Sequence, residues 1–212
     1  MNSEPSFETW IDSLFGQEVK EWSGELENGV ITPKSPLLQV EYLTRLFSYP
    51  KESFTPYSAD QVGQGLDYLM SSYDKMIAAV FDDSVPWNQI QQCLNSIFTL
   101  FKDFFAQKCE PNQKHYADSK ELDFICYMWW DIFPTWGTAN PDFNRTCLTV
   151  MEQTLYLKSW ACCESAIHGL NHWCHNHSEE VNAIINRFLK SRKDIPPSVQ
   201  QEAIWAKNGS MQ

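Results

Sequence analysis

Apolar residues recur at helical spacing along almost the whole chain, and this periodicity constrains the fold more than any other feature of the sequence. The first segment shows the pattern, because its apolar residues follow an i, i+3, i+4, i+7 spacing. These residues are Phe7, Trp10, Ile11, Leu14, Phe15 and Trp22. Similar stretches follow, separated by proline, glycine and polar turn residues. No stretch alternates convincingly as a half-buried strand does, apart from the short run 29–32. The sequence therefore predicts an all-α protein of about nine helices.

Capping residues predict where several of these helices begin. Serine or asparagine N-caps are predicted at Ser35, Ser58, Asn140, Ser159 and Ser178. Two of these residues precede a proline, which is favoured at the first helical position. Gln61 completes a capping box with Ser58. The stretch 50–57 is predicted to be a loop between the second and third helices.

Short links between the later predicted helices favour antiparallel helix pairs stacked side by side, as in HEAT-like arrays. The sequence contains no repeat of fixed period, so an irregular helical bundle is the alternative. We predict a single helical domain over residues 1–212, with the turn-rich stretch 109–119 as the candidate for a weak internal boundary. The helix predicted over 120–133 is apolar on nearly all sides, which predicts a central position in the core.

Composition and cysteine content narrow the class of protein. Hydrophobic residues make up 43% of the chain and aromatic residues 14%, which is ample for a sizeable core. The first residues contain acids but neither the basic region nor the apolar run of a secretory signal. The seven cysteines are irregularly spaced and are predicted to be reduced thiols. We predict a cytoplasmic protein with no membrane-spanning segment.

The net charge is −11 at pH 7, and it is unevenly distributed along the chain. Residues 1–60 hold 10 acidic and 4 basic residues, residues 61–140 hold 10 and 5, and residues 141–212 hold 7 and 7. A negative field favours basic protein partners and disfavours nucleic acids, so we predict a basic protein partner and no nucleic acid. A solvated acidic surface that serves solubility is the alternative. A local basic group is predicted to be a solvated helix end: Arg187, Lys190, Arg192 and Lys193.

The stretch 161–177 (ACCESAIHGLNHWCHNH) holds four of the five histidines and three of the seven cysteines. On a helix, four polar residues fall within about 80° of one another and form a stripe at the edge of an apolar face: Glu164, His168, His172 and His175. Two histidines four residues apart can ligate one metal ion, and His175, His177 or Cys174 can supply a further ligand. Zinc is the metal that this spacing permits.

Two known metal motifs do not fit this stretch. Gly169 stands where zinc proteases have a general-base glutamate. The di-iron pattern needs Glu-x-x-His segments on two helices, whereas Glu164 and His168 are four residues apart. The competing interpretation is a structural polar seam without metal or cofactor, in which Glu164, His168 and His172 hydrogen-bond to one another or to neighbouring backbone. His175 is then a solvent-facing residue near the helix C-terminus.

Three stretches look familiar: 161–173 (ACCESAIHGLNHW), 57–69 (YSADQVGQGLDYL) and 180–212 (EVNAIINRFLKSRKDIPPSVQQEAIWAKNGSMQ). They resemble a loose group of uncharacterised bacterial all-helical proteins that share a Glu-Ser-Ala-x-His-Gly-Leu-x-His-Trp core. The resemblance implies a helical, HEAT-like fold and a cytosolic bacterial origin, but it implies no activity, substrate or catalytic residue. Asn171 occupies the second variable position of this core, where glycine is expected, and this difference bears on close packing at that point.

The sequence contains no complete catalytic set, so we predict a binding protein rather than an enzyme. The predicted function is that of a cytosolic acidic protein-interaction module, such as an inhibitor or immunity-type protein that occludes a basic toxin. The alternative is a metal-binding protein or metal-dependent enzyme that uses Glu164, His168 and His172, with His175 or Cys174 as a further ligand. A helical scaffold within a larger assembly is a third hypothesis.

Overall fold

The computed structural model describes residues 4–20, 26, 29–70, 76–112, 120–133 and 140–210. The structure is 73% helical and has no strand in these ranges. The described residues form 11 α-helices, 9 of them seven residues or longer, which confirms the predicted all-α class and the predicted number of main helices. Several residues used in the sequence analysis lie outside the described residues, namely Trp22 and the stretch 113–119.

The α-helices follow one another as α1 (Phe7–Phe15), α2 (Pro36–Ser48), α3 (Pro50–Phe54), α4 (Ala59–Met70), α5 (Trp87–Leu100), α6 (Ala106–Lys108), α7 (Glu121–Ile132), α8 (Pro141–Leu155), α9 (Trp160–Trp173), α10 (Ser178–Ser191) and α11 (Pro197–Ala206). A 3-10 helix, η2 (Met76–Phe81), precedes α5, and a π-helix, η3 (Phe101–Phe105), follows it. None of these helices has both the length and the apolar content that a membrane crossing requires.

Most of the predicted helix starts are confirmed. The side chains of Ser35, Asn140 and Ser159 each accept a hydrogen bond from a backbone N–H in the first turn of the helix that follows. The capping box at α4 is reciprocal. The Gln61 N–H donates to Ser58 Oγ at 3.2 Å, and the Ser58 N–H donates to Gln61 Oε1 at 3.0 Å. Local capping chemistry thus specifies where α2, α4, α8 and α9 begin.

Two predicted boundaries are wrong. The stretch 50–57 is not all loop, because Pro50 opens the short helix α3 directly after α2; proline suits the first helical position as well as the end of a helix. Ser178 is not the N-cap of α10 but its first residue, and His177 occupies the cap position without a side-chain hydrogen bond. Pro50 suits both the end of one helix and the start of the next, and Ser178 suits both an N-cap and a first helical position. The sequence around each residue therefore does not fix where the helix begins.

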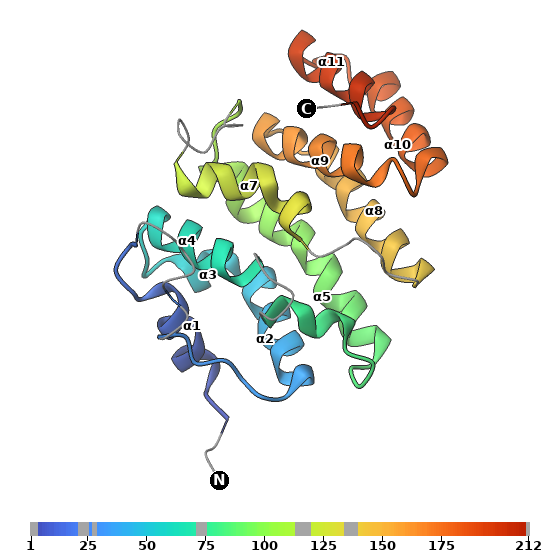
Figure 1. Ribbon diagram of the computed structural model, residues 1–212. Helices are drawn as coiled ribbons and strands as arrows, with labels where there is room; N and C mark the ends of the chain where they lie inside the picture. The colour runs from blue at the N-terminus through green and yellow to red at the C-terminus, as the bar shows by residue number, and fades with distance from the viewer. Residues whose placement is uncertain are drawn as a thin grey trace.

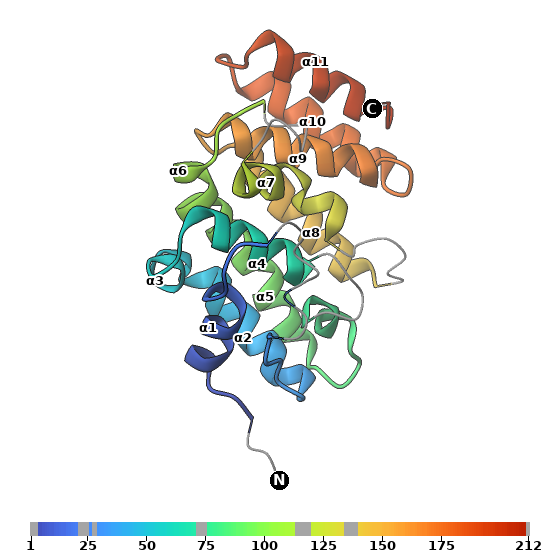
Figure 2. The same cartoon turned by 60° about the vertical axis from the view of Figure 1, so that its left-hand side comes forward.

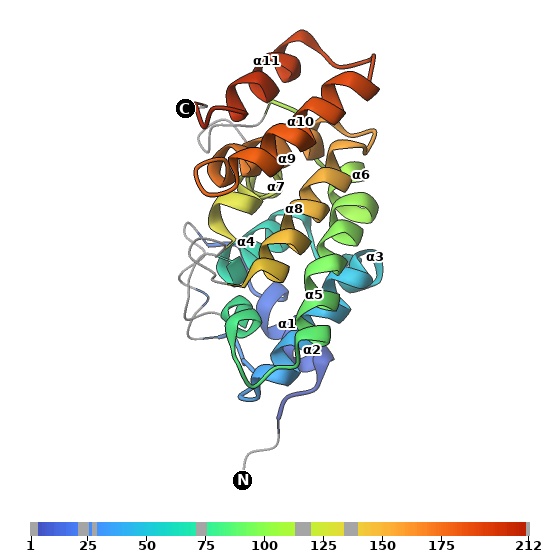
Figure 3. The same ribbon diagram turned by 90° about the vertical axis from the view of Figure 1, so that its right-hand side faces the viewer.

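The main helices alternate between two layers along the chain (Figure 1). Helices α2, α5, α8 and α10 lie side by side in one layer, the α5 layer. Helices α1, α4, α7, α9 and α11 lie side by side in the other, the α7 layer. Figures 2 and 3 show the resulting elongated stack, from α1 and α2 at one end to α10 and α11 at the other. This is the arrangement of a stacked helix array, the first of the two predicted architectures.

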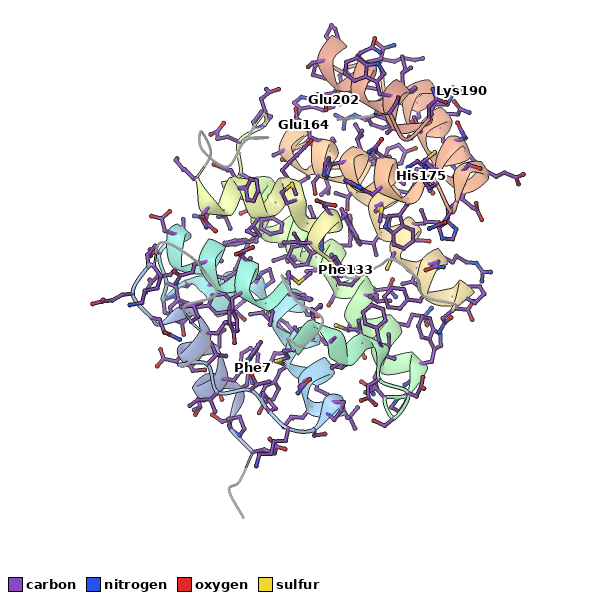
Figure 4. The ribbon with its side chains drawn as sticks, in the orientation of Figure 1. Phe7, Phe133, Glu164, His175, Lys190 and Glu202 are labelled. Atoms are coloured by element: carbon purple, nitrogen blue, oxygen red, sulfur yellow. The ribbon has the colours of Figure 1, made fainter. Side chains whose placement is uncertain are left out.

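A continuous cluster of buried apolar side chains runs from Phe7 in α1 to Ala206 in α11. Near its centre, the buried rings of Trp129 and Trp130 on α7 lie 6.0 and 6.3 Å from the ring of Phe101, measured between centroids. Figure 4 shows Phe133, at the end of α7, in the middle of the stack and Phe7 towards its first end. Helix α7 therefore has the central position that its apolar sequence predicts.

Two glycines allow neighbouring helices to approach α7 closely. A Cβ atom on Gly169 of α9 would lie 2.5 Å from the Cβ of Trp130. A Cβ atom on Gly63 of α4 would lie 2.7 Å from the backbone nitrogen of Leu122. Such distances are far inside van der Waals contact, so a side chain at either position would push the helices apart.

Candidate functional site

Helix α9 presents two histidines beside α7. His168 is half-buried and His172 is exposed, and their Nε2 atoms lie 3.2 Å apart. Asp131 of α7 completes the group, because its Oδ1 lies 3.3 Å from His172 Nε2. One nitrogen or oxygen atom from each of the three residues lies within 4.8 Å of the other two. The structure therefore brings the two predicted histidines together and adds a carboxylate from another helix.

The close contact between α7 and α9 places Asp131 beside the histidines. Gly169, which packs against Trp130, directly follows His168, and Asp131 directly follows Trp130. The glycine that excludes the zinc-protease motif thus has a packing role. Sequence reasoning missed Asp131 because only tertiary packing joins its helix to α9. Its position as the one acidic residue within the apolar run 124–133 is the signal that pointed to it.

Glu164 lies outside the group of three ligand atoms formed by Asp131, His168 and His172. The residue is only 2% exposed, and its Oε2 accepts a hydrogen bond from the Asn112 backbone N–H at 2.7 Å. The buried carboxylate of Asp123 on α7 accepts a similar bond from the Glu110 N–H at 2.9 Å. Two buried carboxylates therefore hold residues 109–112 against α7 and α9. These residues are the described part of the stretch 109–119, which was predicted as a weak boundary.

Tyr127 of α7 forms the inner wall of the site. Its side chain is buried, and its ring centroid lies 4.4 Å from that of His168. Burial, together with the carboxylates of Glu202, Glu164 and Asp131, raises the pKa of the Tyr127 hydroxyl well above its usual range. Figure 4 shows two of these residues, Glu164 on α9 and Glu202 on α11. Carboxylates from three helices of the α7 layer thus create a negative potential at this site.

The remaining predicted ligands lie at or beyond the C-terminal end of α9. His175 is exposed and is labelled in Figure 4 at that end of the helix. The Cys174 thiol is buried and donates to the Lys207 carbonyl oxygen at 3.0 Å. His177 is the N-cap residue of α10. Among the described residues, none of these three side chains joins the group formed by the other two histidines and the aspartate.

The structure corrects the prediction of a solvated helix end for one of the four basic residues, Arg192, whereas the Arg187 side chain is 55% exposed. The Arg192 side chain is only 13% exposed, and its Nη1 donates to the carbonyl oxygens of Leu155 and Leu157 at 3.1 and 2.9 Å. Leu155 is the last residue of α8 and Leu157 lies just beyond its C-cap, where intrahelical donors are lacking. Arg187 forms two hydrogen bonds with Glu152 of α8, at 2.7 and 2.9 Å. Inter-helix contacts thus engage both guanidinium groups.

Charged residues are divided unequally between the two layers. The five described helices of the α7 layer contain nine carboxylates and no lysine or arginine: Glu8, Asp12, Asp60, Asp67, Glu121, Asp123, Asp131, Glu164 and Glu202. The four helices of the α5 layer contain five carboxylates (Glu41, Asp142, Glu152, Glu179 and Glu180) and four basic residues (Arg45, Arg145, Arg187 and Lys190). Asp123, Glu164 and Glu202 are buried, and the other six acids of the α7 layer are at least partly exposed.

Comparison with protein families, curated proteins and solved structures found no match to this chain. The class of protein is therefore defined by the fold and the site alone. It is a two-layer α-helical array with one acidic layer, and a partly exposed His–His–Asp group lies within that layer, between α7 and α9.

Proposed function

We propose that this protein is an acidic interaction module that binds a basic protein partner along its α7 layer. The observation that supports the proposal is the unequal division of charge between the layers. Helices that carry carboxylates and contain no lysine or arginine of their own attract lysine and arginine side chains of a partner and orient the encounter with a basic protein. The nearly balanced charges of the α5 layer offer no comparable attraction.

The architecture suits such binding because side-by-side helices provide an extended surface. Exposed or partly exposed carboxylates occur on three successive helices of the layer, with Asp12 on α1, Asp60 on α4 and Glu121 on α7. An inhibitor or immunity-type protein that occludes a basic toxin is the functional class that fits this surface. A cytoplasmic setting is part of the proposal, since it would keep the seven free thiols reduced.

Two matched triple variants test the proposal. One neutralises the α7 layer with Asp12→Asn, Asp60→Asn and Glu121→Gln, and the other neutralises the α5 layer with Glu41→Gln, Glu179→Gln and Glu180→Gln. Each variant removes three negative charges, and each includes first-turn helix positions, so effects on net charge and on helix dipoles are matched. A partner is first isolated from source-cell lysate on the tagged protein at modest salt, and its affinity for each purified variant is then measured.

We expect the retained partner to be basic. It should bind the α7-layer variant about tenfold more weakly than the unmodified protein and the α5-layer variant with nearly unchanged affinity. Higher ionic strength should weaken binding of the unmodified protein. Failure to retain any partner, or an equal loss of affinity in both variants, would contradict the proposal.

A further inference from the structure

We propose that Asp131, His168 and His172 form a binding site for a divalent first-row transition-metal ion, with zinc as the ion that fits best. In a tetrahedral zinc site, metal–ligand distances of about 2.0–2.1 Å separate neighbouring ligand atoms by about 3.3 Å. The two histidine Nε2 atoms are 3.2 Å apart, and the Asp131 Oδ1 is 3.3 Å from His172 Nε2. Two edges of the tetrahedron are therefore already formed.

The third edge joins Asp131 and His168, whose ligand atoms lie within the 4.8 Å that encloses the whole group. The side chains of Asp131 and His172 are partly exposed, at 36% and 43%, so they have room to rotate towards this arrangement. The two histidines are one turn apart on the same helix, so α9 holds their relative positions.

Hydrogen bonding alone explains the close approach of the three ligand atoms less well than a bound metal ion does. His172 Nε2 has two close neighbours, an imidazole nitrogen and a carboxylate oxygen. In a neutral imidazole, this nitrogen carries either one proton or one lone pair. One proton forms a well-aligned bond to one of the two neighbours, whereas a metal ion at the centre of the group contacts all three ligand atoms.

The ligand set indicates the class of metal. Two imidazole nitrogens and one carboxylate oxygen suit zinc and neighbouring transition metals, whereas magnesium and calcium prefer oxygen ligands. Three protein ligands leave a fourth position open, as in zinc sites that retain a water molecule. The exposure of His172 makes that position accessible to solvent.

The surroundings of the site favour a cation and help to position its ligands. The described helices of the α7 layer contribute carboxylates and no lysine or arginine that would repel a metal ion. The contact of Gly169 with Trp130 fixes α7 against α9 and thereby places Asp131. In this ligand set, Asp131 takes the place that the sequence-based hypothesis gave to Glu164.

Titration of the untagged protein with zinc tests the site directly. The protein is stripped with a chelator, dialysed, and titrated with zinc and separately with magnesium by calorimetry; cobalt absorption reports the coordination geometry. We expect one zinc ion per chain, a tetrahedral cobalt spectrum and no response to magnesium. His172→Gln should weaken zinc binding by at least about 100-fold, since loss of an outer-shell partner alone costs 10–100-fold. Asp131→Asn should also weaken it.

His175→Gln is the matched control, because His175 is exposed, lies one turn after His172 and falls outside the ligand group. Its zinc affinity should equal that of the unmodified protein. Circular dichroism and thermal unfolding of the metal-free variants verify that each is folded. The proposal is overturned if the unmodified protein binds no zinc, or if His175→Gln weakens binding as much as His172→Gln, which would indicate adventitious binding by surface histidines. These titrations use the protein alone, so they stand apart from the partner proposal.

Discussion

Gly169 connects the packing of the fold to the geometry of the candidate metal site. Its Cα lies against Trp130, with no room for a side chain. We expect Gly169→Ala to lower the free energy of unfolding by about 1–3 kcal/mol, because overpacking a close helix contact forces the helices apart. The higher helix propensity of alanine offsets up to about 1 kcal/mol of this loss.

Urea denaturation measures this effect, with Gln201→Ala on the exposed face of α11 as the control for a neutral alanine substitution. A midpoint that is unchanged or raised in Gly169→Ala would show that the two helices are not packed this closely. The zinc affinity of the variant is a second readout, which should also fall because Asp131 would move away from His172.

The buried cysteines provide another prediction at the residue scale. Burial raises the pKa of Cys93 and Cys163 from 9.0 to about 12. At pH 8 only about one thiol in 10⁴ is then ionised, and the thiolate is the reactive form. We expect iodoacetamide to modify Cys109, the only partly exposed cysteine, well before these two, as measured by mass spectrometry over time. Rapid native labelling of Cys93 would contradict its burial.

The same raised pKa values predict how stability depends on pH. The folded state keeps these thiols protonated at pH values where the unfolded chain loses the protons. The free energy of unfolding should therefore fall as pH rises above about 9 and towards 12.

Residue-level chemistry was only partly predictable from the sequence. The pairing of His168 and His172 follows from helical periodicity, because their spacing fixes their relative positions. Asp131 could not be assigned to the candidate site from the sequence, because its distance from the two histidines depends on how α7 packs against α9. The burial of Arg192 could not be predicted for a similar reason: the carbonyl oxygens that it binds lie at and just beyond the end of another helix, α8.

At the element scale, Arg192 links the ends of α8 and α10 to the start of α9. Besides its bonds to the carbonyl groups of Leu155 and Leu157, its guanidinium carbon lies 4.1 Å from the centroid of the Trp160 ring. We expect Arg192→Lys to lower the free energy of unfolding by about 1–3 kcal/mol, because an ammonium group cannot reproduce the planar set of donors.

Urea denaturation of Arg192→Lys tests this link, and Lys193→Ala at the exposed neighbouring position is the control. Stability of Arg192→Lys equal to that of the control would mean that solvent satisfies the carbonyl groups of Leu155 and Leu157 equally well.

Helices were easier to predict than their boundaries. Apolar periodicity and side-chain caps act within a few residues, so the main helices and starts such as those at Ser35, Ser58 and Ser159 follow from the sequence. Pro50 shows the limit of such signals, because the same residue suits the end of one helix and the start of the next.

At the scale of the whole molecule, the acidic layer could not be recognised from the sequence. The acidic residues of α1, α4 and α7 alternate along the chain with segments of the other layer. Dividing the sequence into thirds therefore averages the two layers together. Only the assignment of each helix to a layer reveals that the basic residues of the main helices lie in the α5 layer. The charge pattern is thus a property of the topology.

Hydrogen-exchange mapping with an oligolysine peptide as a defined basic probe tests most directly whether the α7 layer binds basic polypeptides. At low salt, we expect slower exchange in peptides from α1, α4 and α7, no change in α2, α5 and α10, and loss of the effect as salt is added. Protection confined to the α5 layer, or equal in both layers, would contradict the account.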